Sequence, residues 1–429
     1  MTLALPQLTA YDPPESGEGT LDPMGLGTIS ERLASDLVPD FRARMTTFPF
    51  LTTIAVSTVA CSDLSGAHSA DDRTAWPVAF EWLIGEAFAR HNVTATGIPG
   101  ARKARATVLR KQRLSASTYL KGPTVFGFHG VYKPLALALG IVGAGDYGPG
   151  DFTPGPNADR LVRAWEGETG LAGFADNRRG SEGAKLRGQI RHAVADSLKE
   201  GRCAAKPNSA VFGTLAKFLN PAELGIGEAH VLRQLFDERS SPETRELAQL
   251  IDEREFTFER DVLSEIISSA SPGLKPLLTA IDAYERFAAA LHVVFDTMRF
   301  ASTATDTERT CSTTNLASDD GAILAQVLTT LPGLYDAAVR SLPLRQSEFE
   351  GSFAGFQDVD SVSDLALRCL EHHEAVQRRK GCQPWFDREH ERFRIRYPYR
   401  QTSTPEMRDG YVHPVRIAPL AQFLVATHD

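Results

Sequence analysis

The stretch from Asn92 to Gly145 carries the clearest chemical signal in the sequence. It contains no Asp or Glu, although these acids make up 54 of the 429 residues and about seven would be expected in a window of this length. Its cationic residues are Arg102, Lys103, Arg105, Arg110, Lys111, Arg113, Lys121 and Lys133. Solvated helices normally mix both signs, because like charges one turn apart repel. The stretch therefore predicts binding of nucleic acid first, with an ordinary solvated basic face as the second interpretation and an acidic protein partner as the third.

Within this stretch, the segment GFHGVYKPLALALGIV (127–142) has the glycines and the lysine of a phosphate-binding loop. A Walker loop also needs a Ser or Thr directly after the lysine to bind magnesium, and here Pro134 follows Lys133. The segment therefore does not predict nucleotide hydrolysis. Its glycines are interpreted as turn residues, and Gly140 as the end of a helix.

A second basic stretch lies near the C-terminus, in CLEHHEAVQRRKGCQPWFDREHERFRIRYPYR (369–400). Arg378, Arg379 and Lys380 are its first cations, and further arginines alternate with Trp385 and two tyrosines. Arginines among aromatic residues can hold a nucleic-acid backbone and stacked bases, and the same mixture also suits a protein interface.

The same C-terminal stretch contains side chains that can ligate zinc. They are Cys369, His372, His373, Cys382 and His390. Their spacing matches no compact zinc-finger pattern, so buried thiols and surface or capping histidines are the preferred interpretation. No hydrolase motif such as G-x-S-x-G or H-E-x-x-H occurs. We therefore expect no catalytic residues, no metal and no cofactor, and a metal-dependent nuclease built on His372, His373 and His390 is only a third hypothesis.

The elements that position the first basic stretch follow the order of a winged helix-turn-helix. A basic helix at about 103–120 is followed by a Lys-Gly-Pro turn, a short helix over 131–139, and the β-type pair Ile141 and Val142. A Gly/Pro-rich loop (143–157) then leads to another helix. In a winged helix, a cationic helix approaches a groove while loop amides contact phosphates. We expect such a module over 101–170.

Elsewhere the chain reads as mainly α, a multi-lobed helical protein with few short strands. Apolar residues recur at helical spacing through most of 187–380, and 392–400 alternates like one short strand. The apolar, β-branched run 46–63 favours a strand by composition, while its length also allows a buried helix. The expected segments are a leader (1–20), an N-terminal helical domain (21–100), the basic module (101–170), a helical domain (171–300), a linker (301–320) and a C-terminal helical domain with a basic strand (321–429).

Composition limits the class of protein. The formal charge of −8 excludes a generally basic protein, and 42% apolar with 23% charged residues indicates a globular one. Five scattered cysteines indicate reduced thiols rather than a disulfide framework. No window approaches eighteen apolar residues, and the N-terminus has no cationic start or signal-peptide core. We expect a cytoplasmic protein without membrane association.

Three blocks together resemble a group of poorly characterised bacterial proteins from anti-phage and restriction-like loci. The blocks are LDPMGLGTISERLASDLVPDFRARMTTFPF (21–50), FGFHGVYKPLALALGIV (126–142) and HHEAVQRRKGCQPWF (372–386). This chain departs from them in carrying only Arg42 and Arg44 after the first helix. The resemblance implies an accessory, non-catalytic subunit that works beside helicases, ATPases or nucleases. Together with the basic window it leads us to expect a DNA-binding or complex-assembling subunit, with a scaffold that does not touch DNA as the alternative.

Overall fold

The computed structural model describes residues 22–70, 72–94, 97–144, 152–252, 254, 257–303, 310–316, 321–408 and 410–428. The chain forms two compact units, which we describe separately. Unit 1 consists of Met1–Leu37 and Glu255–Val415, and unit 2 of Val38–Arg254 and Arg416–Asp429. Unit 2 contains the whole of the expected basic module together with parts of both neighbouring expected domains. The expected leader lies outside the described residues.

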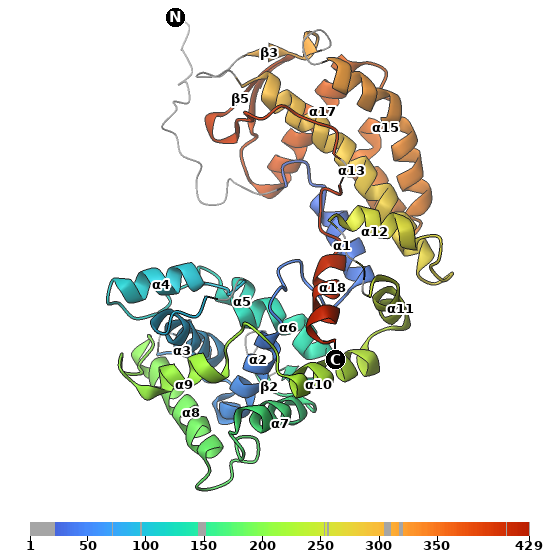
Figure 1. Cartoon of the computed structure of the whole chain (residues 1–429). Helices are drawn as coiled ribbons and strands as arrows, with labels where there is room; N and C mark the ends of the chain where they lie inside the picture. Colours follow the sequence, from blue (N-terminus) through green and yellow to red (C-terminus); the bar gives the residue numbers. More distant parts are fainter. Residues whose placement is uncertain are drawn as a thin grey trace, which may run out of the picture. The chain divides into compact units, whose positions relative to one another are not determined.

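Unit 2 is helical and is built around one central helix, α2. Its elements are α2 (Pro49–Ala60), the 3-10 turn η1 (Ser62–Leu64), α3 (Trp76–Arg90), α4 (Ala101–Leu109), α5 (Pro123–Phe126), α6 (Phe128–Ala138), β1 (Val142–Ala144), β2 (Phe152–Pro154), α7 (Ala158–Thr169), α8 (Glu182–Glu200), α9 (Ala210–Phe218), α10 (Ile226–Arg239), α11 (Pro242–Ile251) and α18 (Ile417–Ala426). Helix α2 packs against α6, α7, α8 and both strands, and every residue from Phe50 to Ala60 is buried. Figure 1 shows α2 enclosed within the unit.

The composition of 46–63 was misleading, because most of this run forms the helix α2 and no strand. A helix satisfies its backbone hydrogen bonds internally, so it can be surrounded by apolar neighbours on all sides. Pro49 suits the first turn, where its missing N–H has no partner to lose. Tertiary burial here overrides the preference of β-branched residues for strands.

Unit 1 is organised around the 27-residue helix α13. Its elements are α1 (Gly27–Leu37), α12 (Glu259–Ile266), α13 (Lys275–Ala301), β3 (Cys311–Ser312), α15 (Gly321–Ser341), α16 (Gln346–Phe353), η2 (Ala354–Phe356), α17 (Val362–Lys380), β4 (Phe386–Glu389), β5 (Arg392–Ile395) and η3 (Tyr397–Tyr399). Helix α13 packs against α1, α12, α15 and α17, so the N-terminal helix joins a bundle formed by the second half of the chain (Figure 1). The strand expected in 392–400 is present as β5, in a sheet of order β3-β5-β4.

The prediction of a mainly α fold with few strands is confirmed, since the described strands form only two small antiparallel sheets. The winged helix is not confirmed. Strands β1 and β2 pair as a wing would, with Gly143 opposite Thr153. However, α5 is a single turn, and α6, which stands where the recognition helix would be, has no exposed residue. A helix buried in this way cannot enter a DNA groove.

Candidate nucleic-acid interface

Helix α4 presents the basic residues of the first stretch. It packs on α3 through a narrow face, on which Ala104 and Thr107 are buried. The expected helix over 103–120 is therefore only half correct, because α4 ends at Leu109 and Lys111 has the left-handed φ of 56°. Six cations of α4 and the following segment are exposed, and we call them the basic surface: Arg102, Lys103, Arg105, Arg110, Lys111 and Lys121.

No cation of the basic surface forms an ion pair with any carboxylate among the described residues. Two of them donate hydrogen bonds to backbone carbonyls, Lys103 to Tyr119 O at 3.2 Å and Arg105 to Val93 O at 2.7 Å. Such bonds fix the side chains without neutralising their charge. The surface therefore keeps its positive charge available for an external anion.

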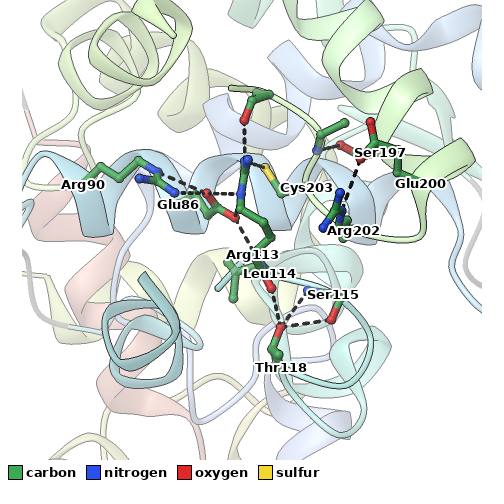
Figure 2. Close-up of polar contacts among 12 residues, drawn as sticks. Glu86, Arg90, Arg113, Leu114, Ser115, Thr118, Ser197, Glu200, Arg202 and Cys203 are labelled. Atoms are coloured by element: carbon green, nitrogen blue, oxygen red, sulfur yellow. Dashed lines mark hydrogen bonds and ion pairs between the residues drawn. The ribbon is translucent and has the colours of Figure 1, made fainter. Parts of the chain in front are cut away.

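Arg113 lies in the same stretch but has a different role. Its Nε donates to the carboxylate of Glu86 at 3.0 Å, and the side chain of Glu86 is fully buried. Arg90 pairs with the same carboxylate at 2.7 Å, and the backbone N–H of Leu114 donates to it at 2.9 Å. Figure 2 shows these groups converging on Glu86 from two sides. The charge of Arg113 is thus used inside the unit, and we do not count it in the basic surface.

The guanidinium of Arg113 also ties in the segment that follows α8. It donates to Sγ of Cys203 at 3.3 Å and to the carbonyl of Ala205, and the N–H of Cys203 donates to Leu114 O at 2.8 Å (Figure 2). Burial, and then the charge of Glu86, raises the pKa of the Cys203 thiol to about 12. Cys203 is therefore a neutral thiol whose sulfur accepts a hydrogen bond from Arg113. Together, Glu86, Arg113 and Cys203 anchor the segment that carries Arg110 and Lys111.

A local turn completes this anchor. The N–H of Ser115 donates to Oγ1 of Thr118 at 2.9 Å, and that hydroxyl donates to Arg113 O at 2.8 Å. Ser115 also forms a β-bridge with Arg202. The residues after α4 are consequently held in a defined conformation that is not helical. This is why the helix predicted from the sequence to about residue 120 ends at Leu109.

Lys133 does not join the basic surface either. It is half-buried on α6, with Nζ 5.1 Å from the ring centroid of Phe152 on β2, and burial lowers its pKa. The glycines of its segment serve close packing. A Cβ on Gly127 would lie 2.1 Å from Glu81 Oε2, and one on Gly130 would lie 2.3 Å from the backbone O of Thr124. Gly127 precedes α6 and Gly140, with a φ of 68°, follows its end as expected, whereas Gly130 lies inside α6 and is not a turn residue. These contacts give no phosphate-binding geometry.

The second basic stretch lies in unit 1 and is partly neutralised by nearby carboxylates. Arg388 pairs with Glu371 and Glu374, and Arg396 pairs with Asp387 at 3.0 Å. Lys380 lies 3.8 Å from the Asp22 carboxylate and also donates to its backbone carbonyl.

Arg378 and Arg379 are exposed in the last turn of α17, without an ion pair to a described residue. At a helix C-terminus, cations are stabilised by the helix dipole. These two arginines therefore need no external ligand to account for them.

The candidate zinc ligands of this stretch do not come together: among the described residues, no group of three or more His, Cys, Asp or Glu side chains could hold a metal ion. His373 is buried, its Nδ1–H donates to Pro23 O at 2.9 Å, and its Nε2 accepts from the N–H of Trp385 at 2.8 Å. His372 bonds to Met24 O through Nε2 at 2.7 Å. Burial lowers the pKa of His373 to about 4, so its neutral form makes both bonds. The two histidines join α17 to the segment before α1.

Sequence reasoning missed a buried polar chain in unit 2 that has the order of a catalytic triad. Ser57 Oγ lies 3.2 Å from Nε2 of His129, and Nδ1 of His129 lies 3.1 Å from Oε1 of Glu81. The Tyr119 hydroxyl also donates to Glu81, at 3.0 Å. All are buried, and Ser57 Oγ has a nearer acceptor in its own helix, Ile54 O at 2.7 Å. A nucleophile needs access to substrate, so we interpret the chain as a core hydrogen-bond network.

One helix in the described part of the chain, α15, is long and apolar enough to cross a membrane by length and composition. A core helix of a globular unit passes the same test, and α15 packs along α13 through buried residues such as Leu324 and Leu331. This single helix is weak support for membrane association.

Comparisons of the chain with protein-family models, with curated proteins and with solved structures found no match.

Proposed function

We propose that unit 2 binds nucleic acid by its phosphate backbone through the basic surface. The observation that supports this most is the contrast between the two arginine-rich stretches. In the second stretch four of the eight cations are paired with nearby carboxylates, namely Lys380, Arg388, Arg394 and Arg396, whereas no cation of the basic surface is. Six like charges placed together without counter-charges repel each other, and a polyanion relieves that repulsion.

Binding of this kind gains free energy from release of the counterions that surround the phosphates. It carries no sequence specificity, because phosphate contacts position a protein without reading bases. The described residues offer no exposed recognition helix of a winged helix, so we propose non-specific binding. The burial of Ser57 and the hydrogen bonds that His372 and His373 make within the fold support a non-catalytic role.

The assignment to a bacterial defence assembly rests on the resemblance of the three sequence blocks alone. We propose it on that ground, with helicase, ATPase or nuclease subunits as partners. Inspection of the genes that flank this one would test it, and a neighbourhood without any nucleic-acid-processing enzyme would count against it.

An acidic protein partner is the second candidate, and one observation favours it. An open groove of about 610 Å³ runs along α4, and aliphatic side chains line it beside Arg102 and Arg105. Such a groove also suits an acidic, amphipathic peptide. Co-purification of a partner that survives nuclease treatment, with no affinity for free oligonucleotides, would favour this candidate over nucleic acid.

Charge reversal tests the proposal. The triple variant Arg102→Glu, Arg110→Glu, Lys111→Glu removes three exposed cations. Their side chains make no hydrogen bond or ion pair with any described residue, so the fold should persist. We expect its affinity for a fluorescent 30-nucleotide oligonucleotide, measured by anisotropy with the full chain, to fall about 100-fold or more.

The matched control is Arg178→Glu, Arg179→Glu, which changes two exposed arginines in the loop before α8. Helix α8 has 19 residues, so its two ends are about 28 Å apart, and its far end is the one that meets Arg113. The control should change affinity less than about threefold, since exposed charges so far away are screened. Equal losses in both variants, or no loss in the triple variant, would contradict the proposal.

A further inference from the structure

Three large apolar side chains are exposed in the same acid-free stretch as the basic surface. Leu109 is 83% exposed at the end of α4, and Val125 and Phe126 on α5 are 59% and 45% exposed. Exposure of one such residue is ordinary, but these occur in a stretch whose exposed charged side chains are all cationic. A ligand for this surface must therefore offer apolar area as well as negative charge.

The ring of Phe126 already carries a cation. The guanidinium carbon of Arg44 lies 4.7 Å from the ring centroid, and Arg44 is itself exposed. The turn of α5 is fixed by backbone bonds, with the N–H of Phe126 donating to Gly122 O at 2.9 Å. The pair is thus a preformed stacking platform, in which a ring and a guanidinium plane both suit a nucleic-acid base.

This platform adjoins the basic surface. Lys121 lies two residues before α5. A Cβ on Gly97, just before α4, would lie 2.4 Å from Oγ1 of Thr46, two residues after Arg44. Further along, a Cβ on Gly100 would lie 2.6 Å from the ring of Tyr119. The segment that carries Arg44 therefore contacts α5 through Phe126 and, through Thr46, the residues just before α4.

From this juxtaposition we infer that the surface takes single strands of nucleic acid rather than duplex, with phosphates on the cations and bases against Phe126 and Leu109. The inference rests on the proposed function. In a duplex the base faces are hidden in the stack, and the backbone offers phosphates and sugars only. A single strand offers the π-faces of its bases, and each base that stacks on an aromatic side chain adds to the affinity.

The position of Leu109 supports the same choice. It lines the open groove along α4 together with Arg102 and Arg105, so a ligand whose phosphates meet these two cations in the groove also meets the isobutyl group of Leu109. A duplex backbone would leave that group against charged oxygens, whereas an unstacked base can lie on it. In addition, α6 presents no exposed residue for a groove.

Anisotropy with the full chain, using dT20 and a 20-base-pair duplex of mixed sequence, tests the inference. We expect wild-type protein to bind dT20 at least about tenfold more tightly than the duplex, and Phe126→Ala to weaken dT20 binding about tenfold with duplex binding changed less than twofold. Phe126→Trp should restore dT20 binding because it keeps an aromatic face. The matched control is Val425→Ala, a 72% exposed apolar residue of the same unit on α18, which should change neither affinity.

The outcomes separate the two claims. Equal affinity of the wild-type protein for dT20 and for the duplex would overturn the single-strand inference. So would a Phe126→Ala variant whose two affinities fall equally or do not fall. Either result leaves backbone binding intact. No binding of either form by wild-type protein would overturn the proposed function itself. Circular dichroism of Phe126→Ala verifies that the helices persist. If they do not, the affinities of Phe126→Trp for dT20 and for the duplex are compared instead.

Discussion

Arg113 Nε lies 3.0 Å from Oε1 of Glu86, and this pair fastens the segment after α4 to the buried face of α3. The pair distinguishes Arg113 from the six cations of the basic surface, which face solvent. Sequence alone gives no sign of this difference, since Glu86 is 27 positions away from Arg113.

Removing Arg113 should destabilise the protein much more than removing an exposed neighbour. Arg113→Met leaves the carboxylate of Glu86 buried with Arg90 as its remaining cation, and loss of one partner of a buried pair typically costs about 3–5 kcal/mol. Arg102→Met, at an exposed position without an ion pair, should cost less than about 0.5 kcal/mol. Urea denaturation followed by circular dichroism measures both. Equal stabilities of the two variants would show that the Glu86 pair does not anchor this segment.

Removing both partners should be less harmful than the single changes suggest. In Glu86→Gln, Arg113→Met the buried carboxylate is gone and only the half-buried Arg90 keeps a charge, so we expect the double variant to recover about 1–2 kcal/mol relative to the sum of the single variants. Strict additivity in this double-mutant cycle would mean that the two residues act independently.

Unit 1 should lose stability in mild acid because of His373. Burial lowers the pKa of His373 to about 4 in the folded state, against 6.5 as its ordinary value. Between these values the unfolded chain binds a proton that the folded chain does not, so the free energy of unfolding falls as pH drops from about 6.5 to about 4. The expected loss from this group is about 3 kcal/mol.

Histidine Cε1–H signals recorded by NMR during an acid titration check this directly. We expect one signal, lost in His373→Gln, to stay in its neutral position down to about pH 5. A titration of that signal near 6.5 would show that the ring is not held neutral by Pro23 and Trp385.

Ser57 should be inert toward a fluorophosphonate probe, despite its position beside His129 and Glu81. Its side chain is buried in the middle of α2 and its oxygen lies closest to Ile54 O. Mass spectrometry of protein incubated with the probe should therefore find no adduct on Ser57. An adduct that is formed by the wild type and lost in Ser57→Ala would show that the buried chain opens and is catalytic.

The sequence was informative wherever the structure depends on local patterns. Helical spacing located α6 and α7, and the acid-free window identified the exposed cations. It failed for α2, because complete burial removes the alternation of apolar and polar residues on which the choice between helix and strand depends. It also failed for residues 110–120, whose conformation is set by Glu86, Cys203 and Thr118 rather than by their own propensity.

For the candidate site, the residue types were visible in the sequence but their pairing was not. Arg396 and Arg110 look alike as letters, yet one contacts Asp387 and the other has no carboxylate partner among the described residues. Similarly, the polar chain of Ser57, His129 and Glu81 joins three helices or their ends, and no spacing in the sequence relates them.

The salt dependence of binding tests the central claim most directly. With dT20 and the full chain, a plot of log K against log salt concentration should be linear with a slope of about −4 if the six cations of the basic surface contact phosphates. The charge-neutral variant Arg102→Gln, Arg110→Gln, Lys111→Gln should bring the slope to about −2. A wild-type slope near zero, or a slope that this variant leaves unchanged, would contradict the claim that the basic surface binds the nucleic-acid backbone.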